Sequence, residues 1–204
     1  MPAINHSTLL HVALKFLACV AGTGLNLHTH AADAIPAPDE WRKETLTFPL
    51  EFAPALKYDG VEHVRFAPQW KDFADERGFS YMFVWDVKSA PLGVPELERD
   101  LIAYFDGLMQ RAAESRKLTK RGNPTKAAFD GGAAVAGWTQ AYAGVLRTWN
   151  AFADGAPLVL EMEITKRPCG NDRMQVFFMV SKAQRTDAIW DTMRAARGAT
   201  VCAV

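Results

Sequence analysis

The chain has 204 residues and carries 23 Lys and Arg against 23 Asp and Glu, so its formal net charge at pH 7 is zero. This balance excludes the basic excess of a typical nucleic-acid-binding protein, and we expect no nucleic-acid partner. The length suits a single domain with a sizeable hydrophobic core.

Residues 1–34 have the order of a cleaved secretory signal peptide. A polar start with one cation, Lys15, leads into an apolar run over 16–21, and the small residues at 31–34 form an Ala-x-Ala type cleavage site. We therefore expect cleavage within 31–34 and a periplasmic or secreted mature protein of residues 35–204. The alternative is a ragged N-terminal helix in a cytosolic protein.

A membrane anchor is not expected after cleavage. No later segment holds the roughly 20 predominantly apolar residues that a spanning helix needs. The run Phe16-Leu17-Ala18-Cys19 resembles a bacterial lipidation box, which stays open as an alternative, although the preceding Lys15 argues against it.

Cleavage would leave one histidine, His63, and two cysteines, Cys169 and Cys202. Two cysteines in an oxidising compartment usually pair, so the sequence predicts a disulfide between them. The alternative, two free buried thiols, would apply to a chain that is not exported. So few His and Cys residues disfavour zinc and haem sites, and we expect no cofactor and no metal. A calcium site at the turn residues Asn171 and Asp172 is not excluded.

A hairpin is predicted first in the mature chain. Residues 45–52 and 61–66 form its arms, and Asp59-Gly60 is a common type I′ turn pair. A proline follows each arm and should end the strand or place it on a sheet edge.

The clearest strand covers residues 79–88. Its two faces alternate Phe79, Tyr81, Phe83, Trp85 and Val87 with Met82 and Val84, and Asp86 lies near its end. Because both faces are apolar, we expect a central strand covered on both sides. The aromatic face is either core or the wall of a pocket for an apolar or sugar-like ligand, with Tyr81 and Trp85 as candidate contacts.

The clearest helix covers residues 95–117, with Pro95 in its first turn. Apolar residues recur at three- and four-residue steps and predict one buried stripe, made of Leu97, Leu101, Tyr104, Phe105, Leu108 and Ala112.

Three further strands are predicted after a loop and short strand over 122–132. They cover 142–152, 158–167 and 174–182, and turn-forming residues between them favour an antiparallel meander.

A second helix is predicted from an N-cap at Thr186 to a stop at Gly198. A terminal strand over 199–204 should then carry Cys202 towards Cys169. Strands in runs with helices between them predict a single α+β domain, in which an antiparallel sheet of about five to seven strands is covered by two main helices.

The meander carries the best polar constellation. A short loop between its first two strands predicts a register with Arg147 opposite Glu163 and Trp149 opposite Glu161, all on one face. This face is either a solvated surface with a cross-strand ion pair or the polar floor of a cleft, with Arg147 and Trp149 as candidate ligand contacts.

Three functions follow as hypotheses. The first is an exported, non-enzymatic binding or accessory protein for a small ligand or an envelope protein, because catalytic residue types are scarce. The second is a carboxylate-dependent hydrolase acting on a cell-envelope or sugar substrate, with Glu161, Glu163 and Asp86 as candidate catalytic residues, although neighbours on one strand suit that task poorly. The third is an interaction subunit of the cell envelope that docks through its N-terminal hairpin.

Overall fold

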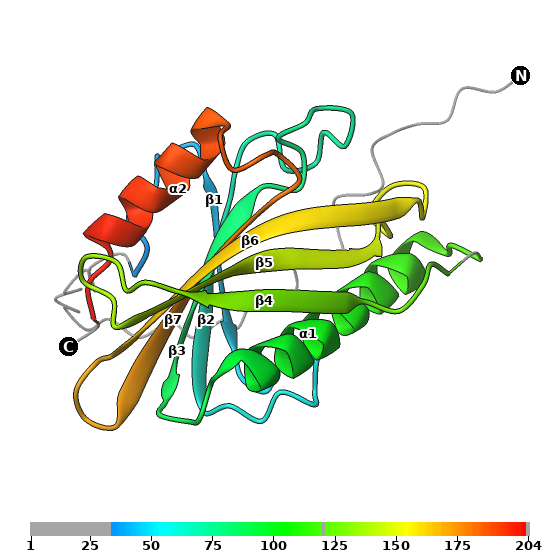
Figure 1. Ribbon diagram of the computed structural model, residues 1–204. Coiled ribbons are helices and arrows are strands. Elements are labelled where there is room, and N and C mark those ends of the chain that lie inside the picture. The colour runs from blue at the N-terminus through cyan, green and yellow to red at the C-terminus, as the bar shows by residue number, and fades with distance from the viewer. Residues whose placement is uncertain (1–33, 120, 203–204) are drawn as a thin grey trace, which may run out of the picture. The chain divides into compact units, whose positions relative to one another are not determined.

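The computed structural model of the protein describes residues 34–119 and 121–202 (Figure 1). The described residues belong to one compact unit and form an α+β fold with one antiparallel sheet, as the sequence predicts. The strands are β1 (Arg42–Thr47), β2 (Gly60–Phe66), β3 (Tyr81–Lys88), β4 (Lys126–Gly132), β5 (Gln140–Trp149), β6 (Pro157–Pro168) and β7 (Arg173–Ser181). The helices are α1 (Val94–Arg116) and α2 (Ala188–Ala199).

The seven strands lie in the order β1-β2-β3-β7-β6-β5-β4, and every neighbouring pair is antiparallel. Strands β1 to β3 form one half in chain order. Helix α1 then connects β3 to β4 at the far edge, and β4 to β7 return to pair with β3. The pairing of β3 with β7 joins the two halves, so β3 is a central strand as expected.

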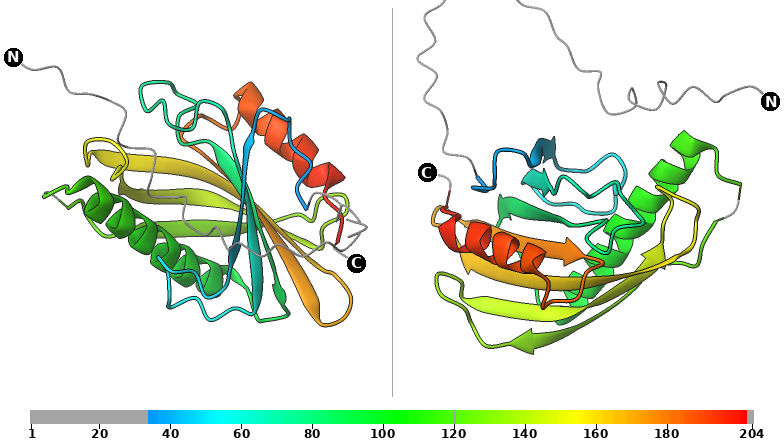
Figure 2. Two further views of the ribbon diagram at one scale, coloured as in Figure 1. Left: turned by 180° about the vertical axis from the view of Figure 1, so that it is seen from behind. Right: turned by 90° about the horizontal axis from the view of Figure 1, so that it is seen from above.

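The sheet is covered on both faces because its central strands are apolar on both sides. Tyr81, Phe83 and Trp85 of β3 face a large core cluster that includes the buried side of α1. Met82 and Val84 face a second cluster, which includes buried residues of α2. The sheet therefore runs between the two helices, as Figures 1 and 2 show.

Helix α1 forms where its sequence pattern predicts. The carboxylate of Glu96 accepts a hydrogen bond from the backbone N–H of Gly93 at 2.9 Å, which satisfies one donor at the start of the helix. The predicted stripe is the buried side, with Leu97, Leu101, Tyr104, Phe105 and Ala112 all in the core.

The predicted tight turn between the first two strands is wrong. β1 and β2 do pair, with Thr47 opposite Val61, but β1 ends before Phe48 and the connection covers 48–59. Phe48 and Leu50 leave the sheet and are buried in the core. Because apolar side chains fold inward here, the segment is a packed loop on one side of the sheet and not an extension of β1.

The meander of β5, β6 and β7 is confirmed, but the predicted register between β5 and β6 is wrong. Arg147 lies opposite Val159, and Glu163 lies opposite Ala143. The reason is Asn150, whose backbone N–H donates to Ala156 at 2.8 Å. This bond ends β5 at Trp149, before the predicted end, and shifts the pairing along both strands.

The predicted disulfide between Cys169 and Cys202 is confirmed, with the two Cα atoms 5.5 Å apart. The predicted terminal strand is wrong, because α2 continues to Ala199 and residues 200–202 form no strand. The N-cap of α2 is Asp187, not Thr186, since the Asp187 carboxylate accepts from the Ile189 N–H at 2.9 Å. The predicted signal peptide lies outside the described residues except for Ala34.

Candidate functional site

The candidate carboxylates of β6 bind arginines around α2. Glu161 pairs with Arg185 at 2.8 Å. Glu163 pairs with Arg194 at 2.5 Å and contacts Arg197 at 3.7 Å. Two carboxylates with cationic partners on the same side of the sheet are suited to holding α2 against β6, and both are occupied by these contacts.

Asp86 lies apart from Glu161 and Glu163, near the other end of the central strands. The Arg173 guanidinium donates to its carboxylate through Nε at 3.0 Å and through a terminal nitrogen at 2.6 Å. Only 5 % of Asp86 is exposed. The structure therefore does not bring the three candidate catalytic residues together around one cleft.

The candidate ligand contacts are also dispersed. Arg147 is exposed on β5, whereas Trp149 is buried in the core cluster that faces α1. Tyr81 and Trp85 belong to that same core. The aromatic face of β3 is packed, as the ring centroids of Phe83 and Phe178 lie 4.4 Å apart.

A carboxyl group that sequence reasoning missed lies inside this aromatic core. Glu62 is 0 % exposed and accepts hydrogen bonds from Trp85 Nε1 at 2.7 Å and the Tyr104 hydroxyl at 3.0 Å. Burial raises its pKa to about 8, against the lowering effect of the two donors. The signal was its position, because Glu62 lies on the same face of β2 as the inward-facing Val64 and Phe66.

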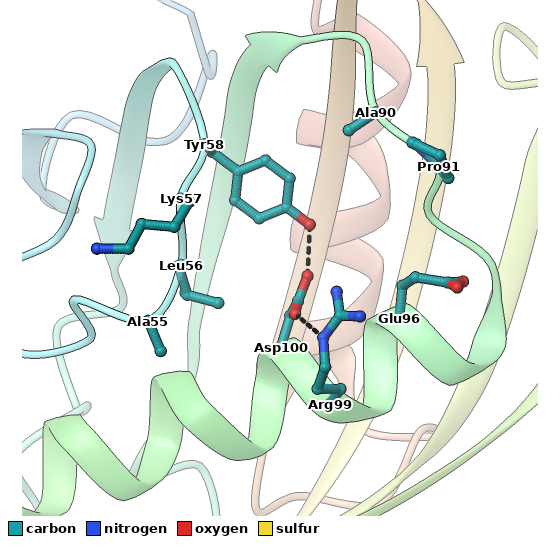
Figure 3. A pocket seen from close by; sticks show the side chains of 9 residues that line it. All are labelled: Ala55, Leu56, Lys57, Tyr58, Ala90, Pro91, Glu96, Arg99 and Asp100. Atoms are coloured by element: carbon teal, nitrogen blue, oxygen red, sulfur yellow. Dashed lines mark hydrogen bonds and ion pairs between the residues drawn. The ribbon is translucent and has the colours of Figure 1, made fainter.

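A groove of about 480 Å³ lies at the surface beside the first turns of α1. We call it the α1 groove. Its lining comes from the β1–β2 loop, the β3–α1 connection and α1 itself (Figure 3). The residues are Ala55, Leu56, Lys57, Tyr58, Ala90, Pro91, Glu96, Arg99 and Asp100.

Three side chains form a connected polar group in the α1 groove. The Tyr58 hydroxyl donates to one carboxylate oxygen of Asp100, and Arg99 Nε donates to the other at 2.8 Å. Asp100 is 5 % exposed, whereas the Arg99 side chain is 68 % exposed. Burial and the hydrogen bond to Asp100 raise the pKa of Tyr58 well above its usual range, so its hydroxyl stays a donor at neutral pH.

Packing of the β1–β2 loop places Tyr58 at this position. Within the loop, Ala53 N–H donates to Leu50 at 3.0 Å and Leu56 N–H donates to Ala53 at 3.1 Å, which makes two successive turns. The ring of Tyr58 lies against Trp85, with centroids 5.2 Å apart. The loop is therefore anchored by buried aromatic contacts, and the Tyr58 hydroxyl is directed to α1.

Sequence reasoning missed the residues of the α1 groove. Asp100 carries a usable signal, because it lies three residues after Leu97 and four before Tyr104, within the apolar stripe of α1. An acid on a buried stripe needs a partner. Tyr58 gave no such signal, because it stands next to the Asp59-Gly60 pair that predicted a tight turn.

In the ranges 34–119 and 121–202, no group of three or more His, Cys, Asp and Glu residues is placed to hold a metal ion. Across the same part of the chain, no helix has both the length and the apolar character needed to cross a membrane.

Comparison with known proteins gives little further information. No family model matches the chain, and no curated protein matches it. Among solved structures, the crystal structure of LpqN, involved in cell envelope biogenesis of Mycobacterium tuberculosis, matches with a TM-score of 0.31 and 13% sequence identity, covering 81% of this chain and 78% of that chain. A likeness at this level carries no argument about activity, so the function must be argued from the geometry of this chain.

Proposed function

We propose that this is an exported, non-enzymatic binding or accessory protein that holds a small ligand in the α1 groove. The observation that carries the proposal is the polar group of Tyr58, Asp100 and Arg99 in an otherwise partly apolar groove. Concave sites with an apolar lining and a few fixed polar groups are typical of small-molecule binding.

Export to the periplasm or to the medium is part of the proposal. It is supported by the disulfide between Cys169 and Cys202, because such bonds persist in oxidising compartments. The order of residues 1–34 supports it independently.

The hydrolase and interaction-subunit hypotheses lack comparable support. Glu161, Glu163 and Asp86 each contact an arginine, and Asp86 lies away from the other two. A glycosidase would need two carboxyl groups facing each other across a substrate. For docking, β1 is an edge strand of the sheet, but no feature of the described residues identifies a partner for it.

The test is non-reducing native mass spectrometry of the protein isolated from the envelope fraction of its own host. We expect a mass cleaved within 31–34, one pair of hydrogens short of the reduced chain, with an additional bound mass. The variant Ala55→Trp places a large side chain at an exposed position of the α1 groove and should lose the bound mass. Ala134→Trp, at an exposed loop position outside the groove, is the matched control and should retain it.

Three results would contradict the proposal. An additional mass that persists in Ala55→Trp would place the ligand elsewhere on the protein. A wild-type protein that carries no additional mass would remove the support for a bound small ligand, and an uncleaved chain with free thiols would overturn export.

A further inference from the structure

We infer that the α1 groove selects a monoanionic carboxylate ligand with an apolar body, and that the ligand's carboxylate binds the guanidinium of Arg99. This inference rests on the proposed binding function and names its ligand class. It follows from the hydrogen bonds of Arg99, from the way Asp100 and Tyr58 hold that side chain, and from the charged residues that line the groove.

Arg99 has hydrogen-bond donors that remain available to a ligand. Its Nε is used by Asp100 at 2.8 Å, and among the described residues no hydrogen bond is found from its two terminal nitrogens. The outer edge of a guanidinium presents two parallel N–H groups, which match the two oxygens of a carboxylate. Figure 3 shows this guanidinium between Asp100 and Glu96, within the lining of the groove.

Asp100 positions Arg99 before a ligand arrives. Its carboxylate is almost fully buried and is held from the opposite side by the Tyr58 hydroxyl, so it is a fixed point for Arg99 Nε. Asp100 and Tyr58 are therefore positioning residues, while Arg99 would contact the ligand. A binding group that is already oriented loses less conformational freedom on association, which favours affinity.

The rest of the α1 groove suits an apolar body. Alongside the polar group, its lining includes Ala55, Leu56, Ala90 and Pro91. Ala55 and Pro91 are exposed and Ala90 is partly exposed, so these three offer apolar surface and no hydrogen-bonding groups, whereas Leu56 is only 2 % exposed. A ligand with a carboxylate at Arg99 can extend along them and bury its own apolar surface.

The charges around the groove favour one negative charge on the ligand over two. Lys57 and Arg99 are balanced by Glu96 and Asp100, so the lining as a whole is neutral. Arg99 interacts electrostatically with both Asp100 and Glu96. Because the lining is neutral, a second negative charge on a dianionic phosphate gains no net attraction from it, yet that charge adds to the cost of removing the ligand from water.

The experiment uses three probes with a common phenyl group: phenylbutyrate, neutral phenylbutyramide and phenylpropyl phosphate. Each is titrated by NMR into the mature, disulfide-bonded protein at neutral pH. We expect phenylbutyrate to bind more tightly than the other two. Arg99→Gln should weaken phenylbutyrate about tenfold or more, the size expected for loss of a charge-assisted pair. Arg99→Lys retains the positive charge but lacks the two parallel N–H groups, so its affinity for phenylbutyrate should lie between those of wild type and Arg99→Gln.

Arg111→Gln is the matched control, because Arg111 is an exposed arginine on the same helix and does not line the α1 groove. It should leave all three affinities unchanged. Equal binding of phenylbutyramide, tighter binding of phenylpropyl phosphate, or no binding of phenylbutyrate would each overturn the inference.

The variant Ala55→Trp separates this inference from the proposed function. One outcome is that the three probes bind with equal affinity and that Arg99→Gln does not change it. If Ala55→Trp then abolishes their binding, the groove is a ligand site and only the carboxylate class is wrong. If phenylbutyrate binds Ala55→Trp as well as wild type, the site itself is wrong and both proposals fail.

Discussion

Glu62 is an ionisable residue enclosed by the aromatic core under α1. Its two partners, Trp85 and Tyr104, are both donors to a carboxylate. Burial nevertheless dominates and raises the pKa from 4.5 to about 8, so the folded protein holds a neutral carboxyl group at neutral pH. The protonated form can donate to the Tyr104 oxygen while its other oxygen accepts from Trp85.

This shift predicts that stability depends on pH. The unfolded chain releases the Glu62 proton at about pH 4.5, whereas the folded chain retains it to about pH 8. Between these values the unfolded state binds fewer protons, so the free energy of unfolding should fall by about 1.4 kcal/mol per pH unit. The contribution is complete below pH 4.5 and lost above pH 8.

Glu62→Gln should remove that slope, because an amide can replace the neutral acid as donor to Tyr104 and acceptor from Trp85. Urea unfolding at about pH 5 and about pH 9 measures it, and the variant should be the more stable protein at the higher pH. Glu51→Gln, an exposed carboxylate outside the core, is the control and should keep the wild-type slope. A Glu62→Gln protein with an unchanged slope would show that Glu62 is ionised in the folded state.

At the scale of the elements, the contact between α1 and the β1–β2 loop depends on Gly107. A Cβ atom at this position would lie 1.8 Å from the carbonyl oxygen of Phe52. The loop backbone therefore approaches the helix more closely than any side chain permits. The same loop carries Tyr58, so this contact also supports the α1 groove.

Gly107→Ala should destabilise the protein, although alanine is the better helix former. The clash with backbone atoms forces the loop away and should cost about 1–3 kcal/mol in unfolding free energy. Gly198→Ala in α2 is the matched control, because a Cβ there meets nothing within 4 Å. It should stabilise by about 0.5–1 kcal/mol. Equal stabilisation in both variants, measured by urea unfolding, would contradict the close contact.

For the whole molecule, the disulfide is the main covalent constraint among the described residues. It links the turn after β6 to the segment after α2 across a sequence separation of 33 residues. Non-covalent contacts lie beside it, since Arg167 donates to the Thr200 carbonyl at 2.8 Å and Gln175 to the Val201 carbonyl at 3.1 Å. The end of α2 is therefore fastened to the sheet by both kinds of contact.

Removal of the disulfide by Cys169→Ser and Cys202→Ser should lower the unfolding free energy by roughly 3–4 kcal/mol, as closure of a loop of this length predicts. Amide exchange should become faster first in α2, whose end loses its covalent link. Full reduction should lower the unfolding free energy of the wild type by the same amount as the two substitutions do, and it should leave the double variant unchanged. Wild-type stability that is insensitive to full reduction would contradict this role.

Local pattern was sufficient to predict the central strand, helix α1, the α+β class and the cysteine pair. The alternation of β3 and the stripe of α1 record which side chains face the core, and this is a property of neighbours along the chain. The pairing of Cys169 with Cys202 was predicted from the count of cysteines and the expectation of an oxidising compartment.

The register of β5 and β6 was decided by a local turn, and the site by contacts between distant residues. Asn150 closes a turn that moves β5 against β6, and sequence spacing alone does not reveal which backbone groups will bond. The same is true of Tyr58 with Asp100 and of Glu62 with Tyr104, each pair 42 residues apart. Such polar groups meet only after the apolar residues around them have packed, because the free energy of burying them depends on the partner that packing provides.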